Sequence, residues 1–299
     1  MKTLFSTLFF VLVLVLAGKA PVQAQGLDAA ATAQLRQQED TLIALADSMT
    51  HVGIPEERQG YVYRFVNKLK DALSVPQSFT YPFDSLATHI NIIGSDDGAF
   101  RIFNWVMPAN EMSMRYYGAI QLPSAGAPKL YGLVDYSSQI QKGASDSILT
   151  GGRWFGAIYY RVMPITVNGE TAYTLFGLNA ANTSSTRKIM DVLHFTPQGP
   201  VFGAPVFGVR SPDTKAQAVR FVLEYKKGVQ VGLNWNEERQ AVIYDRLESE
   251  TNDPNRRYTY VPTGQYDGFR WQNGMWTMVK DLIPITILRD GELPIGGKD

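Results

Sequence analysis

The chain of 299 residues contains no cysteine. This absence excludes a disulfide framework, a thiol nucleophile and a cysteine-ligated metal, and it also excludes the attachment of lipid to an N-terminal cysteine. The fold must therefore be stabilised by buried apolar surface. A chain of this length can bury enough of it to fold without covalent cross-links.

Histidine is scarce, with three residues at positions 51, 89 and 194. Histidine often serves as a general base or a metal ligand near neutral pH, and metal ligands commonly recur at short, regular spacing. No two of these histidines have the spacing His-x-x-x-His. We interpret each as structural, and we predict that the protein uses no metal and no cofactor.

A long apolar run occurs only at the start of the chain. Met1-Lys2 precedes the nearly continuous apolar stretch Leu4–Ala17, and Val22-Gln23-Ala24 offers small residues where signal peptidase cleaves. We predict a signal peptide over residues 1–24, with cleavage after Ala24 leaving 299 − 24 = 275 residues. The protein would then be periplasmic or extracellular. An uncleaved membrane anchor is the alternative.

The predicted mature chain has neither a second apolar run nor a strong net charge. No later stretch approaches the roughly 20 apolar residues of a membrane-spanning helix. Removing Lys2 and Lys19 leaves 28 − 2 = 26 basic residues against 28 acidic ones, a net charge of −2. We therefore expect no membrane span in the mature chain and no nucleic-acid partner.

Two helical patterns follow the signal peptide. Apolar residues at helical spacing predict one helix over Ala29–Met49 and a second over Pro55–Leu73, separated by His51-Val52-Gly53. Because the link is short, the helices should pack antiparallel as a hairpin within residues 25–76. Their apolar faces should cover each other or one face of a sheet.

Residues 77–299 have the composition of a β domain. Short runs rich in Val, Ile, Phe, Tyr and Trp alternate with turn dipeptides such as Asp97-Gly98 and Lys227-Gly228. The predicted fold is mainly β: an antiparallel multi-stranded sandwich or a strongly curved sheet, preceded by the N-terminal helical hairpin.

The hairpin predicted over Arg153–Asn179 is the centre of this domain. Asn168-Gly169 suits a two-residue turn, which places Val167 opposite Glu170 and Tyr160 opposite Gly177. An aromatic ring facing a strand glycine covers the backbone that glycine leaves bare. Since both faces of the first strand are apolar, we predict a central strand covered on both sides.

A second hairpin is predicted over Phe269–Val279, closed by Asn273-Gly274. In this register Gln272 faces Met275 and Trp271 faces Trp276. The two indoles should therefore lie on the same face of the sheet.

Motifs of nucleophilic or phosphate chemistry are missing from the sequence. It contains no Gly-x-Ser-x-Gly elbow and no Walker loop. Ser185-Thr186-Arg187-Lys188 matches the Ser-x-x-Lys pattern of penicillin-binding enzymes, but the companion Ser-Asp-Asn and Lys-Thr-Gly elements are absent. We interpret this match as accidental.

Carboxylates are the remaining route to catalysis, because a pair of them can hydrolyse a glycosidic bond. The candidates lie at turns: Asp96-Asp97, Glu237-Glu238 and Asp267. Adjacent acids in a strand point to opposite faces, so these doublets do not form obvious pairs. Turn formation and solubility explain them more simply.

The sequence predicts a ligand-binding site around Trp235. This residue ends a strand pattern beside Asn236, Glu237 and Arg239. An indole face with polar groups next to it can stack on and orient a bound ligand. Most of the other aromatic residues alternate along strands, which is typical of core packing.

Two segments, SDDGAFRIFNW (95–105) and YTYVPTGQYDGFRWQNGMWTMV (258–279), resemble segments of secreted β-rich proteins of Bacteroidota whose function is uncharacterised. The resemblance covers roughly residues 85–279 and rests on aromatic and turn residues. It implies export and a β-rich fold, and it brings no catalytic residues.

Three classes of function remain open. A secreted or periplasmic non-catalytic binding or structural protein of unknown ligand comes first, because the residues that would signal catalysis are missing or unpaired. The alternatives are a carboxylate-dependent hydrolase acting on glycans and a subunit of a cell-surface assembly. The expected partner is a glycan or an envelope protein.

Overall fold

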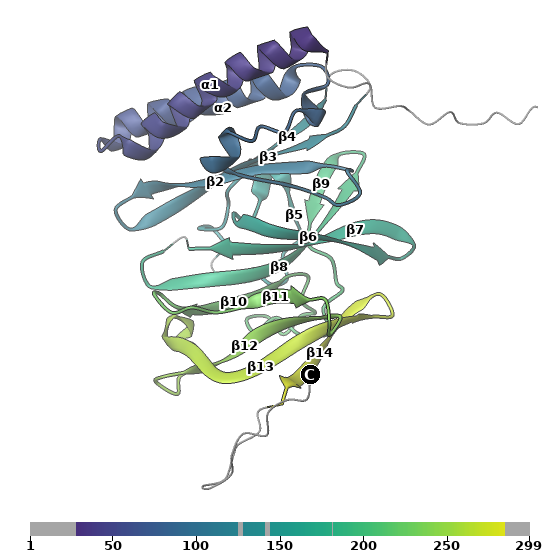
Figure 1. The fold of residues 1–299 in the computed structure, drawn as a ribbon. Coiled ribbons are helices and arrows are strands. Elements are labelled where there is room, and N and C mark those ends of the chain that lie inside the picture. The colour runs from purple at the N-terminus through teal and green to yellow at the C-terminus, as the bar shows by residue number, and fades with distance from the viewer. Residues whose placement is uncertain (1–27, 125–127, 141–143, 181, 285–299) are drawn as a thin grey trace, which may run out of the picture.

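The computed structural model describes residues 28–284 except 125–127, 141–143 and 181. The protein is mainly β, with an N-terminal helical hairpin followed by three antiparallel sheets. Figure 1 shows the hairpin and the sheets stacked as successive layers. The predicted fold class is therefore confirmed, and the expected sandwich takes the form of three stacked sheets.

The hairpin consists of α1 (Ala29–His51) and α2 (Pro55–Ser74), close to the predicted ranges. The Asp28 side chain accepts the Ala31 N–H at 2.6 Å and so caps the start of α1, while Pro55 occupies the first turn of α2. The two helices lie side by side and antiparallel (Figure 1). Among the described residues, no helix combines the length and apolar character that a membrane crossing requires.

The first sheet lies directly under the hairpin. Its strands are ordered β1 (Asn91–Gly94), β2 (Arg101–Asn110), β3 (Ser113–Leu122) and β4 (Lys129–Val134). On the face toward the helices, the Trp105 indole meets the Phe65 ring edge-on at 5.0 Å, and Phe103 and Met107 join the same core. The helices therefore cover one face of this sheet, one of the two predicted arrangements.

The second and third sheets complete the stack. The second has the order β5-β9-β8-β7-β6, and β10 also pairs with β8. Its strands are β5 (Leu149–Thr150), β6 (Ile158–Val167), β7 (Glu170–Asn179), β8 (Ser185–Thr196), β9 (Gly199–Phe202) and β10 (Phe221–Lys226). The third is ordered β11 (Leu233–Asn236), β12 (Ala241–Ser249), β13 (Tyr260–Gln272) and β14 (Met275–Ile283). Short 3₁₀ helices lie at η1 (Ser78–Thr80), η2 (Leu86–Thr88), η3 (Gly151–Arg153) and η4 (Arg257–Thr259).

The second sheet is buried on both of its faces. One face, with Tyr159 and Leu175, packs against the first sheet, and the other, with Phe176 and Met190, packs against Phe269 of the third sheet. The near-continuous apolar sequence of β6 is explained by this position between two cores. The prediction that this strand is covered on both sides is confirmed.

Two details of the β6–β7 hairpin differ from the prediction. Val167 pairs with Glu170 as expected, but a bulge between Tyr159 and Arg161 shifts the register, so that Tyr159 faces Gly177 in place of Tyr160. A Cβ on Gly177 would lie 3.0 Å from Cδ1 of Tyr159, so a ring still covers this glycine. The strand is also an edge strand and not a central one, because β6 ends the strand order.

Asparagine side chains bond the free backbone edge beside β6. Asn104 and Asn91, both from the first sheet, donate to the carbonyl oxygens of Ala157 at 2.7 Å and Tyr159 at 2.8 Å. Asn179 donates to the carbonyl of Gly156 at 2.5 Å. These bonds supply donors to carbonyl groups in β6 and in the residues just before it.

The β13–β14 hairpin has the predicted register, with Gln272 opposite Met275 and Trp271 opposite Trp276. The two indole rings lie 5.2 Å apart in an edge-to-face arrangement. Trp276 also donates from Nε1 to Oγ1 of Thr174 at 3.0 Å. This buried hydrogen bond connects the third sheet to β7 of the second.

We expect Phe65→Ala to destabilise the protein by about 3–5 kcal/mol, because it leaves a cavity between α2 and Trp105. Tyr63→Ala, on the same helix but 68% exposed, serves as the control and should change stability by less than about 0.5 kcal/mol. Urea unfolding followed by circular dichroism measures both. Equal effects would show that α2 does not pack on the first sheet as described.

Asn104→Ala should cost about 1–3 kcal/mol of stability, because the substitution leaves the buried Ala157 carbonyl without its donor. Asn255→Ala, at an exposed asparagine, is the matched control and should be near neutral. The same urea titration compares them. A neutral effect of Asn104→Ala would contradict the proposed bonding of the β6 edge.

Candidate functional site

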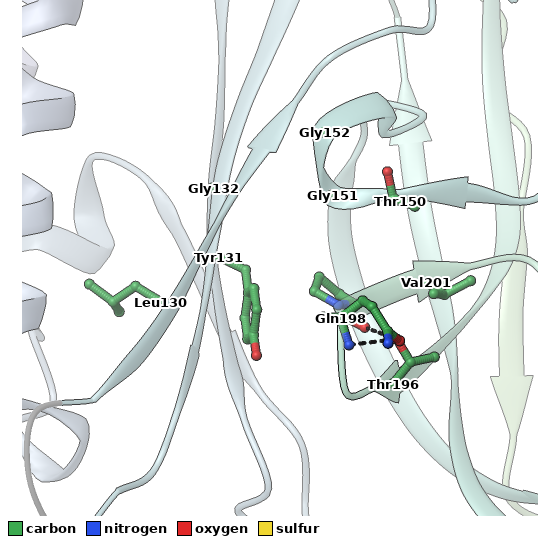
Figure 2. A pocket seen from close by; sticks show the side chains of 11 residues that line it. Leu130, Tyr131, Gly132, Thr150, Gly151, Gly152, Thr196, Gln198 and Val201 are labelled. Carbon is green, nitrogen blue, oxygen red and sulfur yellow. Dashed lines mark hydrogen bonds between the residues drawn. The ribbon is translucent and has the colours of Figure 1, made fainter.

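A pocket of about 430 Å³ lies between β4 of the first sheet and the turn that joins β8 to β9. Figure 2 shows the Tyr131 ring on one side and Thr196 and Gln198 on the other, with Thr150 and Val201 nearby. We call this hollow the Tyr131 pocket. Its volume lies in the range of small-molecule sites, about 300–1,000 Å³.

The alternation of side chains along β4 positions Tyr131. Successive strand residues face opposite sides of a sheet. Leu133 points into the core between the first and second sheets, while Gly132 pairs with Ala119 on the side of the helices. Tyr131, on the same side as Leu133, is directed toward the β8–β9 turn, where it lies half-buried.

The β8–β9 turn is held by its own hydrogen bonds and by a glycine. Oγ1 of Thr196 accepts the Gln198 N–H at 3.3 Å and donates to the Gly199 carbonyl at 3.1 Å (Figure 2). Gly199 has φ = 123°, and a Cβ there would come within 3.0 Å of Cε1 of Tyr131. Glycine is needed here both for the backbone conformation and for space beside the ring.

A third segment, from β5 to η3, completes the pocket. A Cβ on Gly151 would lie 3.2 Å from the Gly132 carbonyl oxygen, so this glycine allows the backbone to come close to β4. Thr150 is exposed beside it. Three segments that are far apart in the sequence therefore meet with little side-chain volume between them.

The chemistry of the Tyr131 pocket is polar and uncharged. Its lining contains no Asp, Glu, His, Lys or Arg among the described residues. The hydroxyl groups of Tyr131 and Thr150 make no hydrogen bond within the described part of the chain. An aromatic face, free hydroxyl groups, the Gln198 amide and close-lying glycine backbone can together bind a neutral polar molecule.

The predicted site residues around Trp235 lie together at the turn after β11. The Trp235 indole is half-buried and meets Trp276 edge-on, with the ring centroids 6.3 Å apart. Asn236 uses Oδ1 to accept the N–H of Arg239 at 2.8 Å, which closes the turn. This asparagine is therefore already bonded within the chain.

Glu237 is likewise engaged. It forms an ion pair of 2.6 Å with Arg161 of β6. Hydrogen bonds from Trp235 and from Arg161 lower the pKa of its carboxyl group. The turn therefore presents part of an indole face, while Asn236 bonds the backbone of the turn and Glu237 is paired with Arg161. A ligand site at Trp235, Asn236, Glu237 and Arg239 stays a prediction.

Of the candidate carboxylates, Asp267 and Glu237 are paired with arginines, whereas Asp97 accepts hydrogen bonds from the Tyr173 hydroxyl and the Ala99 N–H. Arg246 bonds Asp267. Burial raises the pKa of the Asp267 carboxyl group, but the hydrogen bonds from Arg246 and from the Asp281 N–H together outweigh this effect, so the pKa is lower than usual. Glu224, which was not among the sequence candidates, lies 3.2 Å from Arg187. A glycosidase needs a carboxyl group whose pKa is raised so that it can act as an acid.

Asp191 is a carboxyl group whose pKa is raised, and burial is the main cause. Its side chain and that of its partner Arg220 are both fully buried, with Arg220 Nε 2.6 Å from Asp191 Oδ2. A substrate in solution cannot reach this pair. Asp191 is therefore part of the protein interior and not an acid catalyst.

The histidines and the Ser-x-x-Lys match do not form a site. His89 pairs with Asp47 at 3.1 Å, and burial lowers the pKa of His194 on β8. Ser185 donates to Glu224 at 2.5 Å, while the ammonium of Lys188 lies over the Tyr160 ring. No group of three or more potential metal ligands occurs in the part of the chain that the structure describes.

Searches with known protein families, curated proteins and solved structures find no match to this chain. The function must therefore be argued from its own residues. Sequence reasoning missed the Tyr131 pocket, although its Tyr131-Gly132 step and the Gln198-Gly199 turn are visible in the sequence. The missing information is that the two segments face each other.

Proposed function

We propose that the protein is an exported, non-catalytic carbohydrate-binding protein, and that the Tyr131 pocket is its binding site. The observation that carries this proposal is the composition of the pocket. A hollow of about 430 Å³ offers an aromatic ring and free hydroxyl groups, and its described lining has no ionisable acid or base apart from the phenol.

Sugars match this combination of groups. The C–H face of a pyranose ring is apolar and stacks on an aromatic side chain, while its hydroxyl groups both donate and accept hydrogen bonds. Tyr131 supplies the ring, and Thr150 and Gln198 supply hydroxyl and amide groups on the other side of the pocket. The lack of charge favours a neutral sugar over an acidic one.

Binding without hydrolysis is favoured by the state of the carboxylates. Asp267 and Glu224 are paired with arginines, and Asp191 is fully buried. None of these three lines the Tyr131 pocket. A glycan hydrolase would need two carboxyl groups on either side of the scissile bond.

The proposed location rests on the N-terminal residues. A basic start, an apolar stretch and the small residues before Gln25 are typical of a signal peptide. Glycans of the cell envelope or of the surroundings would then be accessible to the protein. The same location suits an envelope protein as a partner.

We expect Tyr131→Ala to weaken glycan binding about tenfold or more, because it removes the stacking surface. The ligand would be identified on an array of neutral and acidic glycans, and its affinity measured by calorimetry. Tyr258→Ala, at a tyrosine that is 47% exposed and outside the pocket, is the control and should bind like the unmodified protein.

Three outcomes would contradict this assignment. If Trp235→Ala lost glycan binding while Tyr131→Ala bound the glycan normally, the binding site would lie at the turn after β11. Release of reducing sugar from a bound glycan would favour the hydrolase. No binding to any neutral glycan would remove the carbohydrate function.

When the whole chain is produced in a Gram-negative host, the exported protein should begin at Gln25, because residues 22–24 fit the specificity of signal peptidase. Intact-mass measurement of the periplasmic and culture fractions tests this. Ala24→Arg, which places a large charged residue at the cleavage point, should retain residues 1–24. A protein that keeps Met1 in the soluble fraction would overturn the proposed export.

A further inference from the structure

A second hollow lies on the opposite side of β4, between the first sheet and α2. Its volume is about 410 Å³, and it is lined by residues of α2, β2, β3 and β4, among them Trp105 and Lys70. We call it the α2 pocket. It is distinct from the Tyr131 pocket in its chemistry, because aliphatic and aromatic side chains form most of its wall.

The hollow exists because two paired residues of the sheet carry little or no side chain. Ala119 of β3 pairs with Gly132 of β4, and both face the helices. A Cβ placed on Gly132 would meet no atom within 4 Å. Elsewhere under the hairpin large side chains fill this layer, as with the contact between Phe65 and Trp105. The space over Ala119 and Gly132 is therefore left open between α2 and the sheet.

One buried polar group in the wall lacks a partner. The Trp105 side chain lines the pocket and is only 5% exposed, and its Nε1–H makes no hydrogen bond within the described residues. Nε1 itself exposes less than 1 Å², so a molecule in the pocket contacts the surface of the indole ring and not this N–H. The Tyr117 ring, which also lines the pocket, stacks on this indole at 5.5 Å and holds it in place.

The entrance combines apolar side chains with one positive charge. Val66 and Val134 line the pocket and are 39% and 57% exposed, so apolar side chains border its opening. Lys70 is the charged residue of the lining, and its ammonium makes no ion pair with any described residue. An anionic end of a ligand would therefore be stabilised at this entrance.

We propose that the α2 pocket binds a small amphiphile, with its apolar body over Ala119 and Gly132 and against the Trp105 ring, and an anionic end at Lys70. The ligand class is a medium-chain carboxylate or an aryl molecule with one acidic group. This site does not depend on the proposed carbohydrate function. It lies on the other side of β4, although Leu130 and Gly132 border both hollows.

Dodecanoate is the probe, and dodecanol is its uncharged counterpart. Calorimetry with the full chain should show saturable binding of one dodecanoate per protein. Ala119→Leu, which fills the hollow, should abolish binding of both probes. Lys70→Gln should weaken dodecanoate a few-fold and leave dodecanol unchanged, because a partly exposed ion pair contributes little more than this. Lys68→Gln, on the same helix but outside the pocket lining, is the control.

The indole group gives an independent readout. The protein has five tryptophans and so five side-chain N–H signals in a nitrogen–proton correlation spectrum, and Trp105→Phe identifies one of them by its loss. Dodecanoate should shift this signal. Urea unfolding of each variant shows whether the fold is retained.

Several results would overturn the proposal. These are no saturable binding of dodecanoate, unchanged binding by a folded Ala119→Leu protein, or a shift of another indole signal while that of Trp105 stays fixed. Tyr131→Ala should leave dodecanoate binding intact. If Tyr131→Ala abolished it, the amphiphile would occupy the Tyr131 pocket and not the α2 pocket.

Discussion

The arrangement of this protein depends on how the backbone beside β6 is satisfied between two sheets. This segment ends its own sheet, and its carbonyl groups at Ala157 and Tyr159 are nevertheless buried under the first sheet. Unbonded carbonyl groups would be costly there, and Asn104 and Asn91 supply donors from β2 and β1. The two sheets are thereby fixed in one relative position, and the helical hairpin and the third sheet pack on the outer faces.

The two proposed sites differ because β4 divides them. Along this edge strand, Tyr131 points toward the second sheet and borders a polar hollow, whereas Gly132 faces the helices and borders an apolar one. Alternation of side chains within one strand is sufficient to produce two chemically different surfaces. Glycines and Ala119 matter on both sides, since the space for a ligand arises where strand residues have no large side chain to fill it.

Local features of the fold could be predicted from the sequence where a turn dipeptide fixes the register. Asn168-Gly169 and Asn273-Gly274 place Val167 opposite Glu170 and Trp271 opposite Trp276, as the structure has them. The register fails further from the turn, where a bulge puts Tyr159 and not Tyr160 opposite Gly177. A bulge adjusts a strand to its neighbours in space, and no dipeptide marks it. For the same reason the apolar pattern of β6 revealed burial but not its position at a sheet edge.

The candidate sites show what local reasoning about function omits. Trp235 and its polar neighbours have the composition of a binding surface, yet Asn236 closes its own turn and Glu237 is paired with Arg161, a residue 76 positions away. The groups of the Tyr131 pocket and the α2 pocket come from distant segments, and the interest of the Tyr131 pocket lies in hydroxyl groups that remain unbonded among the described residues, those of Tyr131 and Thr150. Whether a polar group is bonded or free depends on long-range contacts. A list of residue types near an aromatic ring therefore cannot identify a site until the tertiary partners of each group are known.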